Sequence, residues 1–214
     1  SPHSTTVENI YTAAGPAQYL RAQAARVDLD TVPPLWRNAS IIHLAPIANE
    51  IDSSLPNDFS PALLGVTPQG WMRHWDSSGR VSRSEWSDSE SVLHKANAVV
   101  ISREDVNGDH ELIEQMAHQT RMLVVTEGAE GCVLHWNGDR RRFRAPDVNE
   151  VDATGAGDVF ATAFFIRLLR TRDPWEAARF ATLIASISVT RVGLGGIPTQ
   201  AEIESCLMEV LRTR

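Results

Sequence analysis

The sequence predicts an α/β protein of the Rossmann type, with three layers in the order α/β/α, a mostly parallel sheet and a β-hairpin at one edge. Three observations predict this fold: short apolar runs that do not alternate with polar residues, helical segments between and after them, and one strong hairpin turn. Continuous apolar runs are typical of strands that helices cover on both faces. With 214 residues, 43% of them hydrophobic, the chain is long enough for a sizeable core.

The apolar runs indicate parallel strands. Each is rich in leucine or β-branched residues and ends near Pro, Ser or Thr. The segments between them are long enough for the helical crossover that parallel strands require. In one such segment, Asp109–Thr120, apolar side chains recur on one helical face and predict a helix. The predicted strands are residues 41–45, 63–67, 98–102 and 122–126.

A hairpin follows the last of these strands. Residues 132–136 alternate, Asn137-Gly138 favours a type I′ turn, and residues 140–145 return as the second strand. The three arginines Arg140–Arg142 suggest a contact with phosphate or nucleic acid. Charge also protects the edge strand of a sheet from pairing with other chains, and we favour this second interpretation.

The last part of the chain predicts helices. Residues 158–171 are apolar almost all round, which is typical of a buried helix. Asp173, followed by Pro174, begins a second helix that is expected to run to about Val192. Thr199 begins a third helix by the same capping logic.

The first forty residues are less regular, and we predict a helix over residues 16–26 and a break at Pro33-Pro34. The sequence shows no internal repeat and no low-complexity linker. We therefore predict a single α/β domain over residues 1–214.

Composition argues against several classes of function. The chain has 20 basic and 27 acidic side chains, a net charge of −7 and no clustered positive charge outside the hairpin, so nucleic-acid binding is not expected. No apolar stretch reaches the roughly 18 residues of a membrane span, and the N-terminus lacks the pattern of a signal peptide. Cys132 and Cys206 lie in apolar contexts and are expected to be reduced thiols. The sequence therefore predicts a cytoplasmic protein that contacts no membrane.

The segment Val151–Asp158 carries the clearest chemistry. Its glycines, Gly155 and Gly157, allow a sharp turn that exposes backbone N–H groups, and the helix behind adds its own unpaired donors. Together these groups predict an anion hole. Asp158 is suited to accept a proton from a nucleophile that attacks a bound phosphate. A plain tight connection into a helix is the alternative. The Rossmann and P-loop glycine patterns are both absent.

Asp152–Asp158, followed by Phe160, Ala163 and Phe164, resembles the second signature of the ribokinase-like carbohydrate kinases, the phosphofructokinase-B group. Thr126–Gly131, which reads Thr-x-Gly-x-x-Gly, is similar to the nucleotide loop of that family. Gly193–Pro198 resembles the loop that the family places near the adenine. The resemblance covers most of the chain from about Ile41.

The resemblance implies an ATP-dependent kinase that uses Mg²⁺ and phosphorylates a hydroxyl of a sugar, polyol or nucleoside. It implies that Asp158 is the base and that the amides of Gly155, Ala156 and Gly157 hold the transferred phosphoryl group. The residues implied to bind the nucleotide are Thr126, Gly128, Gly131, Gly193 and Gly195.

The chain also departs from the family pattern. Ser102 and Asp105 stand where the family has Asn-x-x-Glu, so Asp105 is a candidate metal ligand with a helix N-cap as its alternative. Family members carry a longer N-terminal part with the first strands, a β lid and sugar-binding residues, and none of these is recognised before Ile41. A catalytically silent nucleotide-binding fragment, or a regulatory relative, is therefore the alternative function. Many members of the family dimerise through the lid, so the resemblance also makes a homodimer a candidate assembly, although that lid is not recognised here.

The acceptor site is predicted from strand ends. Loops at the carboxyl ends of parallel strands line the site in open α/β sheets, which makes Asn49 and Glu50, and then Gln69 and Arg73, candidates for substrate contact. His43 lies within a predicted strand and is expected to be a satisfied core residue.

Overall fold

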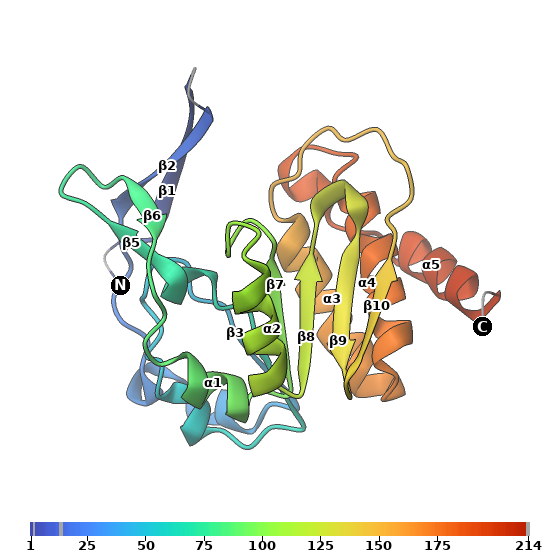
Figure 1. Ribbon diagram of the computed structural model, residues 1–214, viewed down its shortest axis with the longest axis horizontal. Coiled ribbons are helices and arrows are strands. Elements are labelled where there is room, and N and C mark those ends of the chain that lie inside the picture. Colours follow the sequence, from blue (N-terminus) through green and yellow to red (C-terminus); the bar gives the residue numbers. More distant parts are fainter. Residues whose placement is uncertain (2, 13–14, 213–214) are drawn as a thin grey trace. The chain divides into compact units, whose positions relative to one another are not determined.

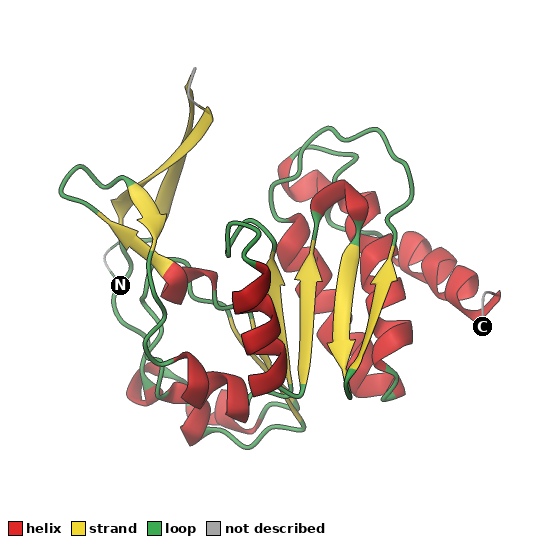
Figure 2. Ribbon diagram, in the orientation of Figure 1, coloured by secondary structure: helices red, strands yellow, loops and turns green. Residues whose placement is uncertain are grey.

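The computed structural model describes residues 1, 3–12 and 15–212. The chain divides into two compact units, residues 1–96 and 97–214. Figure 1 labels the elements and Figure 2 distinguishes helices from strands.

In the described part of the first unit, the strands form one parallel and two antiparallel pairs. β3 and β4 run parallel, with Ile41 opposite Leu63, while β1–β2 and β5–β6 are antiparallel hairpins. A hydrogen bond of 2.8 Å from the amide of Leu20 to the carbonyl of Gly79 links the two hairpins. The strands are β1 Thr6–Thr12, β2 Gly15–Ala22, β3 Ile41–Leu44, β4 Leu63–Val66, β5 Arg73–Trp75 and β6 Val81–Arg83. Helix α1, Ser89–Lys95, also belongs to this unit.

The helix predicted over residues 16–26 is wrong, because β2 occupies this stretch as far as Ala22. Alanine, glutamine, leucine and arginine favour a helix when considered alone. Here the neighbouring β1 supplies a strand partner, with Val7 opposite Leu20. Cross-strand pairing thus overrides the intrinsic preference, as often happens in sheets.

The second unit contains the C-terminal strands and helices. β7, Ala98–Ser102, pairs in parallel with β8, Met122–Thr126, and Ser102 lies opposite Thr126. β9, Cys132–Trp136, pairs with β8 and with β10, Asp139–Phe143, in both cases antiparallel. The helix α2, His110–Gln119, covers one face of these strands, and α3 and α4 cover the other (Figure 1).

The predicted fold class is confirmed, as are the strands over residues 41–45, 63–67, 98–102 and 122–126, to within a residue. The hairpin is also confirmed. Asn137 has φ 53° and Gly138 has φ 76°, and a type I′ turn requires positive φ at both central residues. Among the described residues, no helix is both long and apolar enough to cross a lipid bilayer.

The three C-terminal helices position the loops of the site. α3 is Ala156–Thr171, α4 is Pro174–Ser188 and α5 is Gln200–Arg212. α4 ends before Val192, because the carbonyl of its C-cap residue Val189 accepts hydrogen bonds from the amides of Val151 and Asp152, at 2.8 and 3.1 Å. The end of α4 is therefore attached to the loop that leads into α3.

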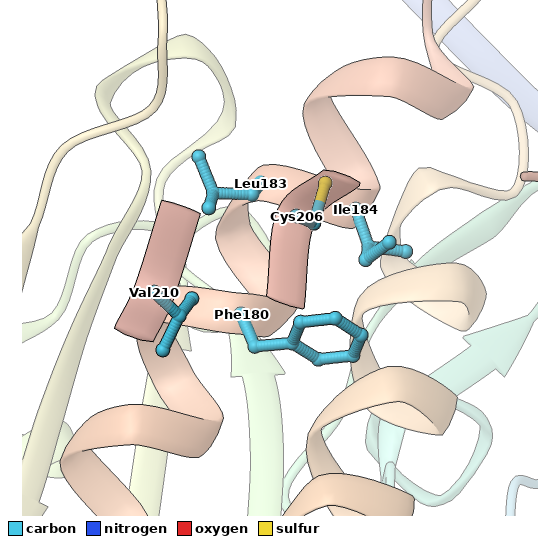
Figure 3. Packing of buried hydrophobic residues seen from close by; sticks show 5 residues of the cluster. All are labelled: Phe180, Leu183, Ile184, Cys206 and Val210. Atoms are coloured by element: carbon cyan, nitrogen blue, oxygen red, sulfur yellow. The ribbon is translucent and has the colours of Figure 1, made fainter. Parts of the chain in front are cut away.

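α5 packs on α4 through a small apolar cluster. Figure 3 shows Phe180, Leu183 and Ile184 of α4 beside Cys206 and Val210 of α5. Cys132 and Cys206 are both free and buried, and burial raises the pKa of the Cys132 thiol to about 11. Both cysteines therefore have structural surroundings rather than the electropositive, exposed surroundings of a reactive thiolate.

A buried ion pair joins α3 to α4. The guanidinium of Arg167 on α3 pairs with the carboxylate of Glu176 on α4, whose side chain is only 3% exposed. Removing one member of a buried pair leaves the other charge uncompensated. We expect Arg167→Met to lower the free energy of unfolding by about 3–5 kcal/mol, measured by urea denaturation.

The double variant Arg167→Met with Glu176→Gln is the control for this prediction. It removes both charges, so it should lose clearly less stability than Arg167→Met alone. Equal losses in the single and double variants would contradict the ion-pair explanation.

Candidate active site

The loop before α3 leaves backbone amides unpaired. Gly155, the N-cap residue of α3, has φ 81°, in the left-handed region that glycine tolerates, and no side chain caps the helix. The amide of Ala156 donates to the carbonyl of Ala153 at 3.1 Å. Within the described part of the chain, the amides of Gly155, Gly157 and Asp158 donate no hydrogen bond. These three N–H groups lie at the positive end of the helix dipole, an arrangement suited to an anion, and for that reason we call Gly155–Asp158 the anion-binding turn.

Gly157 keeps the space at this turn open. A Cβ atom built at this position would have no other atom within 4 Å apart from its own helix and neighbours. Packing within the chain therefore does not require glycine at this position.

Asp158 follows in the first turn of α3 and is exposed. Partial burial of its carboxyl nevertheless raises its pKa. A carboxylate with a raised pKa holds a proton more tightly and is a better general base.

A cavity of about 380 Å³ lies beside the anion-binding turn. Ala156 and Gly157 line it, together with Thr126, Gly128 and Gly131 from the loop after β8. The structure thus brings together two predicted groups of residues, the helix start and the Thr-x-Gly-x-x-Gly loop. Asp158 is not among the lining residues, so its side chain lies outside this cavity.

The remaining walls were not predicted from the sequence. One is the segment between β10 and the signature loop, residues 145–150, and another is α4, with Thr182, Ala185, Ser186 and Val189. The first wall could have been inferred, because a segment that joins the hairpin to the signature must pass the site. The α4 wall had no such signal, since its residues look like ordinary core positions of an apolar helix.

The hydroxyl groups of α4 give the cavity a defined polarity. Thr182 Oγ1 donates to the carbonyl of Ala178 at 2.9 Å, and Ser186 Oγ donates to the carbonyl of Thr182 at 2.8 Å. Because these hydroxyl protons are already used, both oxygens act as hydrogen-bond acceptors, and Thr182 Oγ1 already lies 3.4 Å from Cys132 Sγ. The α4 wall therefore favours a ligand edge that carries N–H or O–H donors.

Ion pairs and a backbone hydrogen bond hold the loop after β8. The carboxylate of Glu127 pairs with Arg142 on β10 and lies 3.9 Å from Arg103 Nη1. The amide of Glu127 donates to the carbonyl of Gly131 at 2.8 Å. The arginines of the hairpin therefore also form ion pairs within the chain, which the edge-strand interpretation did not include. Arg140 Nη1, for example, lies 3.8 Å from Glu114 Oε1.

Gly193 and Gly195, the other candidates for nucleotide contact, are not lining residues of the cavity. They lie in a short 3₁₀ turn, Gly193–Gly196. This turn is linked to the signature loop through Asp152, whose Oδ2 accepts from the amide of Gly193 at 2.8 Å.

Asp105 is engaged within its own turn. Its Oδ2 accepts from the amide of Ser102 at 2.8 Å, and its amide donates to Ser102 Oγ at 3.0 Å. The helix-cap alternative for Asp105 is wrong, because the cap of α2 is Asp109, which accepts from the amide of Leu112. Among the described residues, no group of three or more His, Cys, Asp or Glu side chains could hold a metal ion.

The acceptor candidates of the first unit lie in tightly bonded loops. Glu50 accepts from the amides of Ile47 and Ala48, and Asn49 Nδ2 donates to the carbonyl of Arg73 at 3.2 Å. Gln69 begins the 3₁₀ turn Gln69–Met72.

His43 fits its core interpretation. Its Nε2 lies 3.0 Å from Thr67 Oγ1, and burial lowers the pKa of the imidazole to about 4.

Comparison with known proteins identifies relatives in sequence and in fold. The chain is 28% identical to a fructokinase of Escherichia coli over 80% of this chain, and 38% identical to a ribokinase of Bacillus subtilis over 44% of it. It spans 62% of that fructokinase and 32% of that ribokinase, so it covers less than two thirds of either relative.

Solved structures show the same fold. The ribokinase of Thermotoga maritima matches 94% of this chain, and the chain covers 68% of it, with a TM-score of 0.70 and 22% identity. A pyrophosphate-dependent kinase in the ribokinase family matches 95% of this chain, and the chain covers 75% of it, with a TM-score of 0.78 and 17% identity. The model of the pfkB family of carbohydrate kinases matches residues 87–200, from α1 to the start of α5 and through the whole signature loop. The chain belongs to the pfkB family of carbohydrate kinases.

Proposed function

We propose that this chain carries the nucleotide site and the catalytic base of an ATP-dependent kinase that phosphorylates a hydroxyl of a sugar, polyol or nucleoside. The observation that carries the proposal is the row of unpaired amides at Gly155, Gly157 and Asp158, beside a cavity and a carboxylate of raised pKa. The fructokinase and ribokinase relatives support the substrate class.

In the proposed reaction, the carboxylate of Asp158 accepts the proton of the substrate hydroxyl. The hydroxyl oxygen attacks the γ-phosphorus of ATP at the same time. The new O–P bond forms while the bond from the γ-phosphorus to the β–γ bridging oxygen breaks, and ADP leaves with that electron pair. The free amides of the turn donate to the phosphoryl oxygens as charge develops there. Because the amide of Ala156 already donates to Ala153, we assign this role to Gly155, Gly157 and Asp158.

The nucleoside part of ATP, the phosphoryl donor, suits the cavity. Its volume of about 380 Å³ falls within the range of small-molecule sites, and Ala185, Val189 and Phe160 give it apolar walls. The acceptor oxygens of Thr182 and Ser186 suit the amino edge of adenine.

Mg²⁺ is part of the proposal as the partner of the nucleotide phosphates. The described residues do not build a metal cage of their own, and the Asp105 carboxylate is held by the Ser102 amide. Magnesium commonly binds through substrate phosphates with one or two carboxylates, so we propose that it enters with ATP and neutralises phosphate charge there.

The test is a phosphorylation assay with ATP, Mg²⁺ and a panel of fructose, ribose, inositol and nucleosides. Phosphorylation of one acceptor would support the kinase. ATP binding without phosphorylation of any acceptor, also by the full-length protein, would favour the catalytically silent alternative. Failure to bind any nucleotide would overturn both functions.

Gly157→Ala tests the anion-binding turn itself. We expect the affinity for ATP to fall about tenfold or more, because the new methyl group covers the amides that should hold a charged phosphate. Titration calorimetry measures this change.

The same variant should keep or slightly raise its thermal midpoint without ligand, because alanine is the better helix former and its Cβ atom meets nothing. Unchanged ATP affinity in a folded Gly157→Ala protein would contradict the assignment.

A further inference from the structure

The chain contains two Asn-Gly pairs in almost the same local sequence. Asn107-Gly108 lies in the sequence Val-Asn-Gly-Asp, and Asn137-Gly138 lies in the sequence Trp-Asn-Gly-Asp. Both asparagines are exposed, and both have a left-handed backbone, with φ of 51° at Asn107 and 53° at Asn137. A large difference in reactivity between the two pairs would therefore come mainly from the structure around them.

An asparagine followed by a glycine can react with its own backbone. The glycine nitrogen loses its proton to a base such as hydroxide and attacks Cγ of the asparagine. The new N–Cγ bond forms, the Cγ–Nδ2 bond breaks, and the side-chain nitrogen takes a proton from water and leaves as ammonia. Water then opens the succinimide ring at one carbonyl or the other, which gives aspartate or isoaspartate. The reaction needs an accessible N–H and space beside it, which a glycine provides because it has no side chain.

The pair in the hairpin turn meets both requirements. Within the described part of the chain, neither the amide of Gly138 nor the side chain of Asn137 has a hydrogen-bond partner. The pair is exposed at the end of the hairpin, and a Cβ atom at Gly138 would meet nothing within 4 Å apart from its chain neighbours. Solvent base can therefore reach this N–H group, and no packed atom hinders the attack.

The other pair is held by its turn. The amide of Gly108 donates to the carbonyl of Arg103 at 2.9 Å, and the amide of Asn107 donates to the carbonyl of Glu104 at 3.0 Å. A Cβ atom at Gly108 would also lie 3.5 Å from Arg103 Nε. The hydrogen bond of Gly108 must open before its nitrogen can lose the proton, and the bond of Asn107 restricts the rotation that the attack requires.

We propose that Asn137 is a site of spontaneous deamidation, and that the turn around Gly108 protects Asn107 from the same reaction. The two products differ in their effect on the hairpin. Aspartate keeps the backbone length, whereas isoaspartate routes the backbone through Cβ and Cγ and so adds one atom to the turn. Turn type and loop length set the register of a hairpin, so isoaspartate should weaken the pairing of Asp139 with Trp136 beside the turn.

The experiment incubates the wild-type 214-residue chain at mildly alkaline pH and follows both pairs by peptide mass spectrometry. Synthetic peptides that carry asparagine, aspartate or isoaspartate at each position identify the products by their retention times. We expect Asn137 to deamidate about tenfold or more faster than Asn107, since the need to open one hydrogen bond of typical strength slows a reaction by up to about that factor.

The same chain unfolded in guanidinium chloride is the matched control. The two pairs lose their structural difference there and should react at similar rates. Asn137→Gly tests the effect on the hairpin, because Gly-Gly also suits a type I′ turn but cannot deamidate. The thermal midpoint of the incubated wild type should fall as isoaspartate accumulates at position 137, while incubated Asn137→Gly should keep its own midpoint.

Several results would overturn the inference. One is a reaction at Asn107 that is as fast as, or faster than, the reaction at Asn137 in the folded chain. Another is a preference for Asn137 that persists in the unfolded chain, because it would come from the neighbouring tryptophan and not from the fold. An equal fall of the midpoint in incubated Asn137→Gly would contradict the effect on the hairpin. None of these measurements involves a nucleotide, so their failure and the failure of the proposed function are independent.

Discussion

Asp158→Asn should lower kcat by about 10² to 10⁴-fold in the full-length protein, because an amide cannot accept the acceptor's proton. The backbone amides of the anion-binding turn do not depend on this side chain. Affinity for ATP should therefore stay within about threefold of the wild type, a difference well under 1.4 kcal/mol. Steady-state kinetics measures the change in kcat, and nucleotide titration measures the affinity for ATP.

The pH dependence gives a second readout for Asp158. Partial burial raises the pKa of its carboxyl, so the base is lost to protonation at a higher pH than for an ordinary aspartate. In a plot of kcat/KM against pH, activity should fall as the pH drops through the pKa of Asp158. The midpoint of this fall should lie above about 3.9, the ordinary pKa of an aspartate.

Asp147→Asn is the control for the pH dependence. It removes one negative charge near the cavity but leaves the proposed base, Asp158, in place. The midpoint of the fall in this variant should stay where the wild type has it. A full-length Asp158→Asn protein with near-normal kcat would remove Asp158 from the proposed mechanism.

Gly131→Ala should destabilise the protein by several kcal/mol, at the upper end of what single substitutions do. Gly131 has φ 91°, and a Cβ atom there would lie 2.0 Å from the carbonyl oxygen of Phe143 and 2.7 Å from the amide nitrogen of Ala145. Both obstacles are backbone atoms, which cannot rotate away as a side chain can. Urea denaturation measures the loss.

Gly128→Ala is the matched comparison for Gly131→Ala. Gly128 lies in the same loop and also has a positive φ, of 57°, but a Cβ atom there would meet nothing within 4 Å. It should lose only the roughly 1–2 kcal/mol that a left-handed conformation costs a non-glycine residue. If the two variants lose equal stability, backbone conformation alone explains Gly131, and its close packing contributes nothing.

Much of the fold could be predicted because its strands are continuous apolar runs. The runs over 98–102 and 122–126 became β7 and β8, and Asn137-Gly138 fixed the hairpin turn. The prediction failed over 16–26, where helix-forming residues pair with β1. The presence of a partner strand depends on the tertiary structure, and local propensity gives no information about it. The organisation as one domain stays a prediction.

The candidate site was predictable where it is local in sequence. The signature loop and the loop after β8 each carry their glycines within a few positions, and both line the cavity. The α4 wall could not be predicted, since Thr182 and Ser186 reach the site only through the packing of a helix. The link between Asp152 and Gly193 spans 41 positions, and no local pattern in the sequence announces it.

The helix α3 begins without a side-chain cap, because Gly155 occupies the N-cap position. Glycine at this position costs the helix only about a few tenths of a kcal/mol relative to a capping side chain, but it leaves the N–H groups of the first turn without a partner. A bound phosphate would take the place of the missing cap, and any ligand that binds only the native state raises stability by mass action. The resistance of α3 to local unfolding would then increase with the fraction of protein that has a phosphate group bound. The rate of amide hydrogen exchange along this helix would therefore measure that fraction.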